Sequence, residues 1–496
     1  MSSPITQKTL PLLLLIDKTA GESVYLQLAG KLMDLIKDGS LQAGYQLPST
    51  RKLAGLLAVH RKTIIRAYDD LLAQGWLESH SGSGTFVAKH LPEIDPQHFQ
   101  HKDQQLQTSK TAGFSIDPIP HLQLDVIRSS DGFHLDDGFP DPRLAPLTDL
   151  SRAYRSQLLT GNSYIKLGYN DPQGSLWLRE ELAAYLSETR GLKITVNNIL
   201  ITRGTVMGLY LTCTNLIKPG DQAVTGETSW RGADINLIQA GAILNRIPVD
   251  EYGLQIDELE KICLKKVIRL VYVTSHHHYP TTVSLRADRR IQLLRLAEKY
   301  GFIIFEDDYD YDFHYENKPL LPLASADTAG MVLYCGSFTK TISPAFRIGY
   351  LVASENVIQH LSKLRRIIDR QGDTMLENSL AELLQNGSIQ RHMRKSLRIY
   401  RQRRDLFCSL LKDQLGDVLD FEVPDGGMAV WTKFNSRINL PDLAQKALKK
   451  DLYFSNGLMH NSSAQLLNAT RLGFASSTAD ELEHCVEILT KLIRQQ

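Results

Sequence analysis

The sequence predicts an α/β protein whose sheet is mainly parallel, preceded by a small α+β unit of three helices and a β-hairpin. Two stretches with different patterning indicate this division. Residues 1–88 combine apolar residues at helical spacing with two short strand-like runs around a Gly-Ser turn, whereas residues 129–496 alternate strand-like and helical segments. With 496 residues the chain is also too long for one hydrophobic core, so two or three domains are expected.

Composition and net charge restrict the class of protein only weakly. Hydrophobic residues make up 43% of the chain, charged residues 22%, and the formal net charge is +1, so partners have to be judged from local charge. Five cysteines are scattered without a CxxC pair, which predicts reduced thiols in a cytoplasm and neither disulfides nor a zinc site. The apolar run Leu10–Ile16 is too short to span a bilayer and lacks a signal-peptide cleavage site, so we expect a strand or a packing arm and no membrane segment.

Three helices and a hairpin are expected in the first 88 residues. Apolar residues recur on one helix face between 24 and 36, and Gly39 ends that helix. Ser49 is placed to cap a short second helix at about 51–57, and a third helix covers about 60–74. The run WLESHSGSGTFVA then forms two short strands around a turn. This order of elements is that of a winged helix-turn-helix.

Local charge in this unit favours a nucleic-acid partner. No acidic residue occurs between Asp38 and Asp69. The basic residues of the same stretch lie off the apolar stripe at or near the starts of the second and third helices: Arg51, Lys52, Arg61, Lys62 and Arg66. A helix-turn-helix directs these positions at phosphates and base edges, so we expect this unit to bind double-stranded DNA.

The stretch GYQLPSTRKLAGLLAVHRKTIIRAYDDLLAQGWLESHSGSGTFVA resembles the DNA-binding domain of GntR-type bacterial regulators. The resemblance implies that Arg51 and Arg61 contact bases. It places four further residues near phosphates, namely Ser49, Lys62, Thr63 and Arg66, and it brings the wing glycines Gly82 and Gly84 to the minor groove. One departure is His60, since the family usually has Ser or Thr as the cap of the recognition helix; a histidine can still reach a phosphate.

Residues 89–128 have the composition of a flexible linker. They are rich in Gln, His and Asp, contain few large aliphatic residues and show no sustained hydrophobic period. We therefore expect a tether that lets the domains before and after it move relative to each other.

The rest of the chain alternates strand-like runs with helical stretches. The runs are Ile199–Thr202, Ala223–Thr225, Leu270–Thr274, Phe302–Phe305, Met331–Cys335 and Ile348–Val352. Such βαβ alternation predicts a mainly parallel sheet with helices on both faces. Ligands of such sheets bind beyond the carboxyl ends of the strands, so the residues just after each run define the candidate site.

Five of these strand ends are followed by residues that could bind a ligand or take part in catalysis. Gly204-Thr205-Val206 opens a helix whose free N–H groups can hold a phosphate, and Trp230 comes after the next strand. The run SHHHYPTT contains three adjacent histidines, which point to alternate sides of an extended segment and so do not predict a metal site. EDDYDYDF supplies carboxylates, and Lys340 comes after the strand that ends in YCGS. An amine nucleophile, a phosphate cradle, a flat aromatic ring and a carboxylate are the parts that pyridoxal 5'-phosphate requires.

This part of the chain resembles fold-type I aminotransferases, with their large and small subdomains. The specific motifs are Ser-Phe-Thr-Lys followed by Pro344 and Arg347, Glu-Asp-Asp-Tyr after a strand, and GYNDPQGSLWLREELAAYLSETRGL. Residues 12–496 as a whole resemble the MocR subfamily of regulators, in which a GntR-type domain is fused to an aminotransferase-like domain. The resemblance implies a winged helix-turn-helix at 1–88, a linker at 89–128 and an aminotransferase-like domain at 129–496.

The resemblance also implies roles around the cofactor ring. Lys340 would form the internal aldimine, which requires a partly desolvated amine. Asp307 would pair with the pyridine nitrogen, Tyr309 would donate to the phenolic oxygen, and Trp230 would stack on the ring. Tyr279, in the loop after the third strand, is also assigned to the cofactor site.

Phosphate and ligand contacts are implied in the same way. The phosphate would be held by Ser337, Thr339 and Arg347 together with Gly204, Thr205 and Val206. Tyr169 would reach the phosphate of the other subunit of a homodimer. Arg471, in NATRLGFA, would bind the carboxylate of an amino-acid ligand by a two-pronged ion pair.

Two loops depart from the family pattern. Where the family usually reads His-Gln-Tyr-Pro-Thr-Gly, this chain has His277-His278-Tyr279-Pro280-Thr281-Thr282, so a permissive glycine is missing and a titratable ring is added. The ring-stacking loop, Glu227–Trp230, lacks the usual proline. These departures bear on ligand choice and turnover rather than on cofactor binding.

Two functions are consistent with these patterns. The first is a DNA-binding transcriptional regulator that senses an amine or amino acid by aldimine exchange at Lys340. The alternative is an active pyridoxal-phosphate-dependent aminotransferase that carries a DNA-binding module. Both need Lys340 and Asp307; the acid-free basic surface of the winged helix favours the first. The effector, the operator sequence and the direction of regulation are not encoded in any pattern we recognise.

Overall fold

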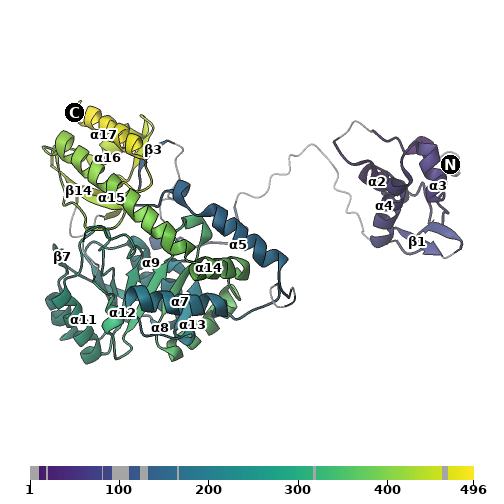
Figure 1. Cartoon of the computed structure of the whole chain (residues 1–496). Coiled ribbons are helices and arrows are strands. Elements are labelled where there is room, and N and C mark those ends of the chain that lie inside the picture. The colour runs from purple at the N-terminus through teal and green to yellow at the C-terminus, as the bar shows by residue number, and fades with distance from the viewer. Residues whose placement is uncertain are drawn as a thin grey trace. The chain divides into compact units, whose positions relative to one another are not determined.

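The structure is a computed structural model, and it describes residues 10–17, 21–80, 82–91, 111–122, 132–162, 164, 167–316, 320–460 and 467–495. The chain forms two compact units, Met1–Ile116 and Asp117–Gln496 (Figure 1). The predicted boundaries at 88/89 and 128/129 remain predictions, and most of the predicted linker lies outside the described residues.

The N-terminal unit contains the predicted three helices and hairpin. Its elements are α1 (Leu10–Leu13), α2 (Val24–Lys37), α3 (Thr50–Leu57), α4 (Arg61–Ala73), β1 (Leu77–His80) and β2 (Gly84–Val87). β1 and β2 pair antiparallel, with His80 opposite Gly84 at the turn. The winged helix-turn-helix order is confirmed.

The core of this unit is built from the apolar stripes seen in the sequence. Leu28 and Leu32 of α2 are buried in one cluster with Ile64 and Leu71 of α4. The run Leu10–Ile16 forms no strand: its first residues are helical in α1, and Leu10 is buried in the same core. The alternative of a packing arm was the better of the two expectations, because apolar residues at a chain end gain most by covering an open core.

The C-terminal unit is organised around a seven-stranded sheet. In spatial order its strands are β4 (Ile199–Thr202), β12 (Gly349–Val352), β11 (Val332–Ser337), β10 (Ile303–Asp308), β9 (Ile268–Val273), β5 (Gln222–Gly226) and β6 (Ile243–Ile247). β12 runs antiparallel to both of its neighbours, whereas the pairs among β11, β10, β9, β5 and β6 are parallel. The expectation of a mainly parallel sheet is confirmed.

Two details of the sheet differ from the sequence-based expectation. β6 was not predicted, because this edge strand is largely accessible and carries Asn245 and Arg246 instead of a continuous apolar run. Residues Glu306–Asp308 were expected just after the strand, but they are its last three residues and are buried. Their carboxylates therefore lie inside the protein, at the edge where sheets of this kind bind ligands.

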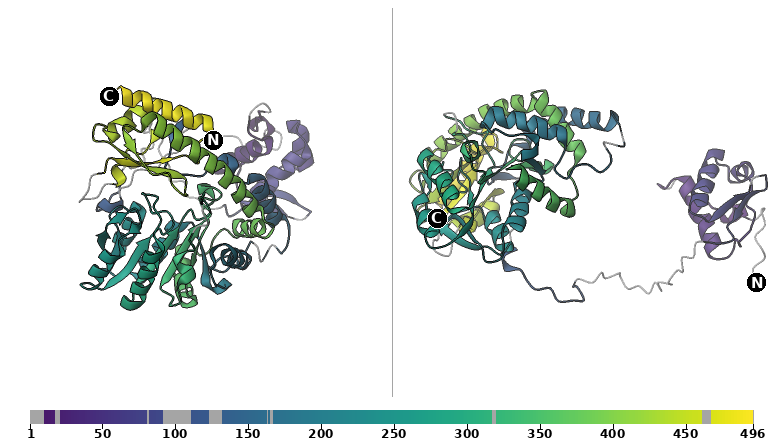
Figure 2. Two further views of the ribbon diagram at one scale, coloured as in Figure 1. Left: turned by 60° about the vertical axis from the view of Figure 1, so that its left-hand side comes forward. Right: turned by 90° about the horizontal axis from the view of Figure 1, so that it is seen from below.

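Helices cover both faces of this sheet (Figure 2). Alternate residues of β10 enter different cores, Ile304 on one face and Phe305 on the other. One face is covered by α8 (Thr205–Leu216), α9 (Arg231–Gln239) and α13 (Glu355–Ile368). The core on the other face receives α5 (Leu147–Leu159), α7 (Leu176–Arg190), α10 (Ile256–Cys263), α11 (Ala287–Tyr300), α12 (Leu323–Ala326), α14 (Thr374–Gln385) and α15 (Ser388–Leu415).

A smaller subdomain is formed at the end of the chain, at the top of Figure 1. It contains a three-stranded sheet of β13 (Leu419–Asp420), β14 (Ala429–Phe434) and β16 (Ala469–Gly473), covered by the second half of α15 with α16 (Leu440–Leu448) and α17 (Ala479–Arg494). β3 (Phe133–Leu135) pairs in parallel with β15 (Leu452–Phe454), so the start of this unit is attached to the small subdomain. A short β7–β8 pair (Val249–Asp250, Gly253–Leu254) and five 3-10 turns, at 120–122, 142–144, 196–198, 344–346 and 458–460, complete the elements of the described residues.

The described part of the chain offers neither a membrane span nor a metal cluster. No helix there is long and apolar enough to cross a bilayer, and no group of three His, Cys, Asp or Glu side chains is arranged to hold a metal ion. All five cysteines are buried as free thiols.

Candidate functional site

Lys340 lies in the loop after β11, at the carboxyl edge of the central sheet. Its Nζ donates a hydrogen bond to the carbonyl of Gly138 over 2.6 Å and lies 4.4 Å from the centre of the Phe139 ring. Burial lowers the pKa of Lys340, against the opposing effect of the nearby carboxylates of Asp137 and Asp136. A lowered pKa increases the share of neutral amine, which is the nucleophilic form.

Asp307 presents an unused acceptor to the same edge of the sheet. Its Oδ2 accepts a hydrogen bond from Tyr272 over 2.8 Å, whereas Oδ1 is buried and has no hydrogen-bond partner among the described residues. Burial raises the pKa of Asp307 to about 7, although the bond from Tyr272 works in the opposite direction. A buried carboxylate oxygen without a donor fits the protonated ring nitrogen of pyridoxal phosphate, so the residues present suit this cofactor.

The residues predicted to hold the phosphate lie close together, after β4 and before β12. Gly204, with φ 78°, caps α8, and a Cβ at this position would lie 2.9 Å from Nη2 of Arg347. Arg347 donates from Nη2 to the carbonyl of Arg203 over 3.0 Å. Because Thr205 and Val206 open α8, their N–H groups have no partner within the helix and can hold an anion.

Ser337 and Thr339 lie next to this cradle on the β11 side. The Ser337 hydroxyl donates to Thr339 Oγ1 over 2.7 Å, and the Thr339 N–H donates to Ser337 Oγ over 3.0 Å. Ser337 pairs with Gly349 of β12, which in turn pairs with Thr202 of β4. Pairing across the three strands brings these hydroxyls beside the start of α8.

Arg471 lies deep in the site, on β16 of the small subdomain. It is 2% exposed, and its Nε lies 2.9 Å from Oδ1 of Asp137 in an ion pair that lacks an aligned hydrogen bond. Its Nη1 donates to the carbonyl of Pro280 over 3.1 Å, and the guanidinium centre is 4.9 Å from the Tyr279 ring. The binding of a ligand carboxylate by Arg471 remains a prediction, and the structure adds that Arg471 already faces a carboxylate of this chain.

Two tyrosines, from the segments after β9 and β10, lie near the Arg471–Asp137 ion pair. Tyr279 donates from its hydroxyl to Asp137 Oδ2 over 3.0 Å, and Tyr309 donates to the carbonyl of His277 over 3.0 Å. Burial raises the pKa of both phenols well above the ordinary value, and the positive charge of Arg471 opposes this rise. Both tyrosines therefore stay protonated and able to donate.

Trp230 and Tyr169 are not drawn into this cluster. Trp230 is half-buried, packs against the core beneath α8, α9 and α13, and folds back over Gly232. Tyr169 is 79% exposed, with the Arg370 guanidinium 4.1 Å from its ring centre. The ring-stacking role of Trp230 and the cross-subunit role of Tyr169 remain predictions.

The three adjacent histidines face three different partners. His276 Nε2 lies 2.5 Å from the carbonyl of Leu320, His277 Nδ1 lies 2.8 Å from Asp310 Oδ1, and His278 Nε2 lies 2.9 Å from the carbonyl of Thr228. Burial lowers the pKa of His278 to about 4, so this ring is neutral at physiological pH. The added histidine thus connects the loop after β9 to the loop after β5.

The residue that replaces the family's glycine in this loop, Thr282, has an unfavourable backbone conformation. Thr282 adopts φ 67°, a region that glycine enters freely and that a β-branched residue avoids. Two hydrogen bonds of 2.7 Å, from the Thr282 N–H to the His278 carbonyl and from the His278 N–H to the Val283 carbonyl, hold the loop in this conformation.

Sequence reasoning missed several residues of the site. Asp137, Gly138 and Phe139 arrive from the start of the unit, after a strand of only three residues that gave no periodic signal. Tyr272 looks apolar because it sits in a buried strand, and His460 lies at the end of a short 3-10 turn. Two acidic residues directly before a Gly-Phe-Pro turn were the one signal that was available.

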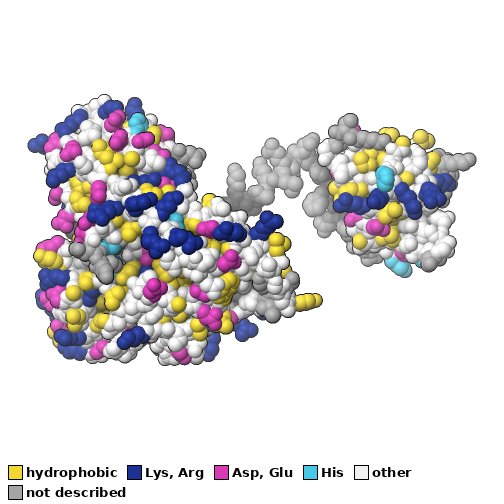
Figure 3. All heavy atoms as spheres, viewed as in Figure 1, with side chains coloured by type: hydrophobic (Ala, Val, Ile, Leu, Met, Phe, Trp, Pro, Cys, Tyr) yellow, Lys and Arg dark blue, Asp and Glu magenta, His cyan; other side chains and the backbone are white. Residues whose placement is uncertain are grey.

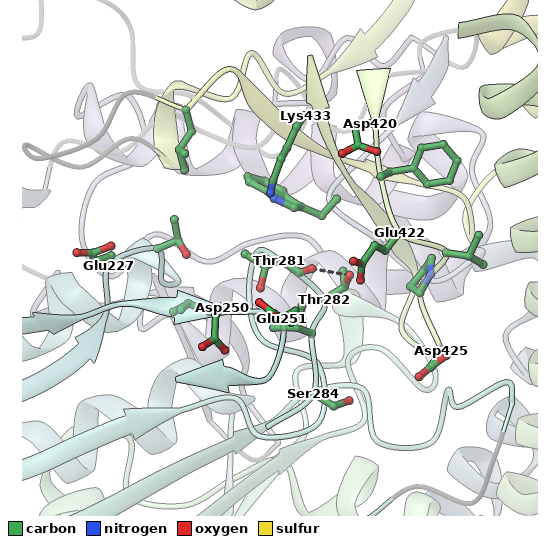
Figure 4. A pocket seen from close by; sticks show the side chains of 18 residues that line it. Glu227, Asp250, Glu251, Thr281, Thr282, Ser284, Asp420, Glu422, Asp425 and Lys433 are labelled. Atoms are coloured by element: carbon green, nitrogen blue, oxygen red, sulfur yellow. Dashed lines mark hydrogen bonds between the residues drawn. The ribbon is translucent and has the colours of Figure 1, made fainter. Parts of the chain in front are cut away.

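Thr281 and Thr282 are among the residues that line a cavity of about 750 Å³ (Figure 4). Most labelled side chains in it are acidic, among them Glu227, Asp250, Glu251, Asp420, Glu422 and Asp425, with Lys433 on the small-subdomain wall. None of its lining residues belongs to the predicted cofactor set. The placement of Lys340 and Asp307 at the ends of adjacent strands therefore locates the candidate site there and not in this cavity.

The second candidate site is the winged helix. Ser49 caps α3 by accepting from the Lys52 N–H over 3.3 Å, and His60 caps α4 by accepting from the Lys62 N–H on its Nδ1 over 3.2 Å. The departure at His60 therefore preserves the cap that the family makes with a hydroxyl. Figure 3 shows Lys and Arg side chains gathered on the face of this unit turned to the viewer.

The other predicted DNA-binding residues differ in their exposure and in their contacts within the unit. Arg51 and Lys62 are exposed, whereas Arg61 Nε donates to Thr50 Oγ1 over 3.3 Å, and Arg66 lies 4.0 Å from the Tyr25 ring centre. Thr63 is half-buried in the first turn of α4.

The wing turn contains the two predicted glycines. Gly82 and Gly84 both have positive φ, and Gln46 donates to the Ser83 carbonyl between them over 2.8 Å. This bond anchors the wing on the body of the unit.

Comparison with known proteins agrees with the fold of both units. Residues 145–489 match the family described as aminotransferase class I and II, and residues 24–87 match the bacterial regulatory proteins of the gntR family. A probable rhizopine catabolism regulatory protein, MocR, from Rhizobium meliloti is 29% identical over 446 residues, which cover 89% of this chain and 88% of that protein. The uncharacterized HTH-type transcriptional regulator YisV from Bacillus subtilis (strain 168) is 28% identical over 481 residues, with 95% and 96% coverage.

Solved structures show the same fold for the larger unit. The kynurenine aminotransferase from Pyrococcus horikoshii superposes with a TM-score of 0.68 at 25% identity, covering 74% of this chain and 92% of that one. A fold-type I aminotransferase domain preceded by a winged helix-turn-helix is thus the class that fold and site define. The chain belongs to the aminotransferase class I and II family, with a GntR-type domain in front of it, which is the architecture that the resemblance to MocR-type regulators predicts.

Proposed function

We propose that this protein is a transcriptional regulator that binds operator DNA as a homodimer and responds to an amine or amino acid at Lys340, with pyridoxal 5'-phosphate as cofactor. The observation that carries the proposal is the pairing of a desolvated amine at Lys340 with an orphaned carboxylate oxygen at Asp307, on a chain that starts with a GntR-type domain. Pyridoxal phosphate supplies an aldehyde that reacts reversibly with primary amines.

Each residue around the proposed cofactor could make a contact that suits its functional group. Asp307 offers Oδ1 to a protonated ring nitrogen, and Tyr272 keeps Oδ2 oriented. Arg347 and the start of α8 supply a guanidinium and free N–H groups to a phosphate. Tyr309 stays protonated and could donate to an anionic oxygen of the ring in place of the His277 carbonyl that it bonds here.

The proposal of a homodimer rests on the surface beside the phosphate cradle. A hollow of about 660 Å³ is lined there by Arg203, Val206, Tyr210 and Arg347 among others, and Val206 and Tyr210 are 43% and 41% exposed. Tyr169, at 79% exposure, is the residue that the family places in the neighbour's cradle. A second copy seated on this hollow would cover apolar side chains and complete the phosphate site.

The alternative, an active aminotransferase, is favoured by the same Lys340 and Asp307 and by the kynurenine aminotransferase fold. The two functions differ in the events after a ligand has bound. An aminotransferase passes the amino group to an added keto acid in repeated turnovers, whereas a sensor changes its DNA affinity without net turnover.

The proposal is tested on the full chain loaded with pyridoxal phosphate. An operator is first selected from a random duplex library, and DNA affinity is then measured by fluorescence anisotropy with and without added amines and amino acids, while the visible band of the cofactor is recorded. We expect one ligand class to change both DNA affinity and the band, and Lys340→Ala to lose both responses while still binding DNA. Lys433→Ala, in the neighbouring cavity, serves as the control and should respond like the unmodified protein. An unchanged response in Lys340→Ala would remove Lys340 from the sensor.

A further inference from the structure

Arg471, the residue that would recognise a ligand carboxylate, already has a carboxylate of this chain beside it. Both oxygens of Asp137 are engaged at the site, Oδ1 at 2.9 Å from Arg471 Nε and Oδ2 as the acceptor of the Tyr279 hydroxyl at 3.0 Å. Arg471 is 2% exposed, and its Nη1 is bonded to the Pro280 carbonyl. Little of the positive charge of Arg471 is left uncompensated.

Asp137 is held where it is by the residue before it. Asp136 Oδ1 accepts from the N–H groups of Gly138 and Phe139 over 2.8 and 2.9 Å, and Asp136 Oδ2 accepts from the Ser476 hydroxyl over 2.6 Å. The Gly473 N–H donates to the Asp136 carbonyl over 2.7 Å, which ties this turn to β16, the strand that carries Arg471. Asp137 and Arg471 are therefore positioned by the same strand.

Close packing leaves the turn little room to swing away. A Cβ at Gly138, which has φ 80°, would lie 3.3 Å from Met428 and from Ala429. A Cβ at Gly473 would lie 2.5 Å from Asp136 Oδ1. With its backbone fixed on both sides and its carboxylate, 28% exposed, held by Tyr279 and Arg471, Asp137 is a preorganised counter-ion.

The same turn also borders the reactive amine, because the Gly138 carbonyl accepts from Lys340 Nζ. A ligand amine that reaches this position therefore arrives next to Asp137. A carboxylate on the carbon that bears the amine would have to share Arg471 with Asp137, and two carboxylates at one guanidinium repel each other. An amine without such a carboxylate meets no repulsion and can use Asp137 as an attractive negative charge.

We propose that the ligand of this protein is a primary amine that has no carboxylate on its amine-bearing carbon, and that Asp137 excludes α-amino acids by acting as the built-in partner of Arg471. This inference rests on the proposed function and refines its ligand class. It replaces the role expected for Arg471 from family resemblance with a role in holding Asp137.

The test compares two probes that differ only in the carboxylate, n-propylamine and L-2-aminobutyrate. With cofactor-loaded protein, the shift of the visible band should occur at a concentration at least about tenfold lower for n-propylamine, a difference of about 1.4 kcal/mol. Asp137→Asn keeps the shape and removes the charge, and it should reverse the preference. Glu422→Gln, on the wall of the separate acidic cavity, is the control and should keep the preference of the unmodified protein.

A second measurement needs no cofactor. Propionate should raise the melting temperature of cofactor-free Asp137→Asn, because it can take the vacated place at Arg471, and should leave the unmodified protein unchanged. Asp137→Ser serves in the same way if the asparagine variant folds poorly. Equal stabilisation of the unmodified protein and the variants by propionate would overturn the inference, as would a preference for L-2-aminobutyrate that Asp137→Asn leaves unaltered. If neither probe shifts the band of the unmodified protein, the proposed function fails, while the propionate result still decides the role of Asp137.

Discussion

Tyr272 donates its hydroxyl to Asp307 Oδ2 over 2.8 Å, and both side chains are buried on adjacent strands of the central sheet. A hydrogen bond to the charged form of a carboxylate favours that form. The phenol therefore counteracts the burial that raises the pKa of Asp307 to about 7.

Tyr272→Phe is expected to weaken the binding of pyridoxal phosphate by about 10- to 100-fold, the equivalent of roughly 1.5–3 kcal/mol for a hydrogen bond to a charged group. The affinity is measured by titrating the cofactor into cofactor-free protein and following the visible band. The matched control is Tyr334→Phe, since Tyr334 donates to Asp308 over 2.6 Å from the strand on the other side of β10. If both variants lose affinity equally, the effect belongs to general packing and not to Asp307.

Asp307→Asn should stabilise the cofactor-free protein in a pH-dependent way. The ordinary pKa of an aspartate is 3.8, and that of folded Asp307 is about 7, so the folded state retains a proton that the unfolded state has lost between these values. The contribution of this group to stability therefore declines as pH rises from about 4 to 7. At pH 8 we expect the variant to exceed the unmodified protein by roughly 2–4 kcal/mol, and at pH 4 to match it.

Urea unfolding of the larger unit at the two pH values measures this difference. The same variant should bind pyridoxal phosphate more weakly, because a neutral amide replaces the partner of the ring nitrogen. An asparagine variant that is less stable than the unmodified protein at pH 8 would show that Oδ1 of Asp307 has a partner in the cofactor-free protein.

His460→Phe is expected to raise stability by about 1–3 kcal/mol, the cost of a buried polar group without a partner. His460 is 4% exposed, packs between the rings of Tyr279 and Trp431, and neither ring nitrogen has a hydrogen-bond partner among the described residues. Burial lowers its pKa to about 4, below the ordinary 6.5. The unfolded state therefore binds the extra proton, and the protein loses stability as pH falls from about 6.5 to 4.

The gain from His460→Phe should accordingly be larger at pH 5 than at pH 7, as measured by thermal unfolding. His392→Phe is the contrasting variant, because His392 Nε2 lies 2.7 Å from the Thr341 carbonyl and its removal leaves that acceptor unpaired. We expect His392→Phe to destabilise the protein. Similar effects of both substitutions would mean that His460 is satisfied by contacts other than those described.

Arg51→Ala and Lys62→Ala should separate base recognition from phosphate binding. Loss of Arg51 is expected to cost about 1–3 kcal/mol and to relax the preference at one position of each half-site, whereas loss of Lys62 should weaken all sequences alike. Quantitative footprinting on a selected operator, repeated over a range of salt concentrations, distinguishes the two. Affinity should fall steeply with salt, because phosphate contacts release counterions. Equal and sequence-independent losses would reassign Arg51 to the backbone, and salt-independent binding would contradict the DNA site.

Much of the fold could be predicted because the patterns were local. The helices of the winged unit and six strands of the central sheet were predicted from apolar spacing. Both ends of each of these six strands lie within three residues of the predicted ends. β6 could not be predicted from hydrophobicity, since an edge strand need bury only one side. The small subdomain was expected only from the resemblance and its strands were not predicted from local pattern, because β13 and β15 are only two and three residues long.

The site was predictable where a residue comes directly after a buried strand and not where it arrives from elsewhere. Lys340 and Asp307 lie at strand ends, so the rule for parallel sheets found them. Asp137 reaches the site through the pairing of β3 with β15, a contact between segments far apart in the sequence that no local pattern encodes. The capping of α4 by His60 is local, but the usual Ser or Thr is absent at that position, so the sequence did not predict that the imidazole accepts from the Lys62 N–H.

The chain enters the larger unit through two attachments that belong to different subdomains. Pro120–Leu122 contacts α9 beside the large sheet, with His121 Nε2 at 2.8 Å from Gln239 Oε1, and Phe133–Leu135 pairs with β15 of the small subdomain. The distance between these two anchors therefore depends on the angle between the subdomains. A ligand that altered this angle would therefore change the distance between the two anchors, although it contacts neither of them.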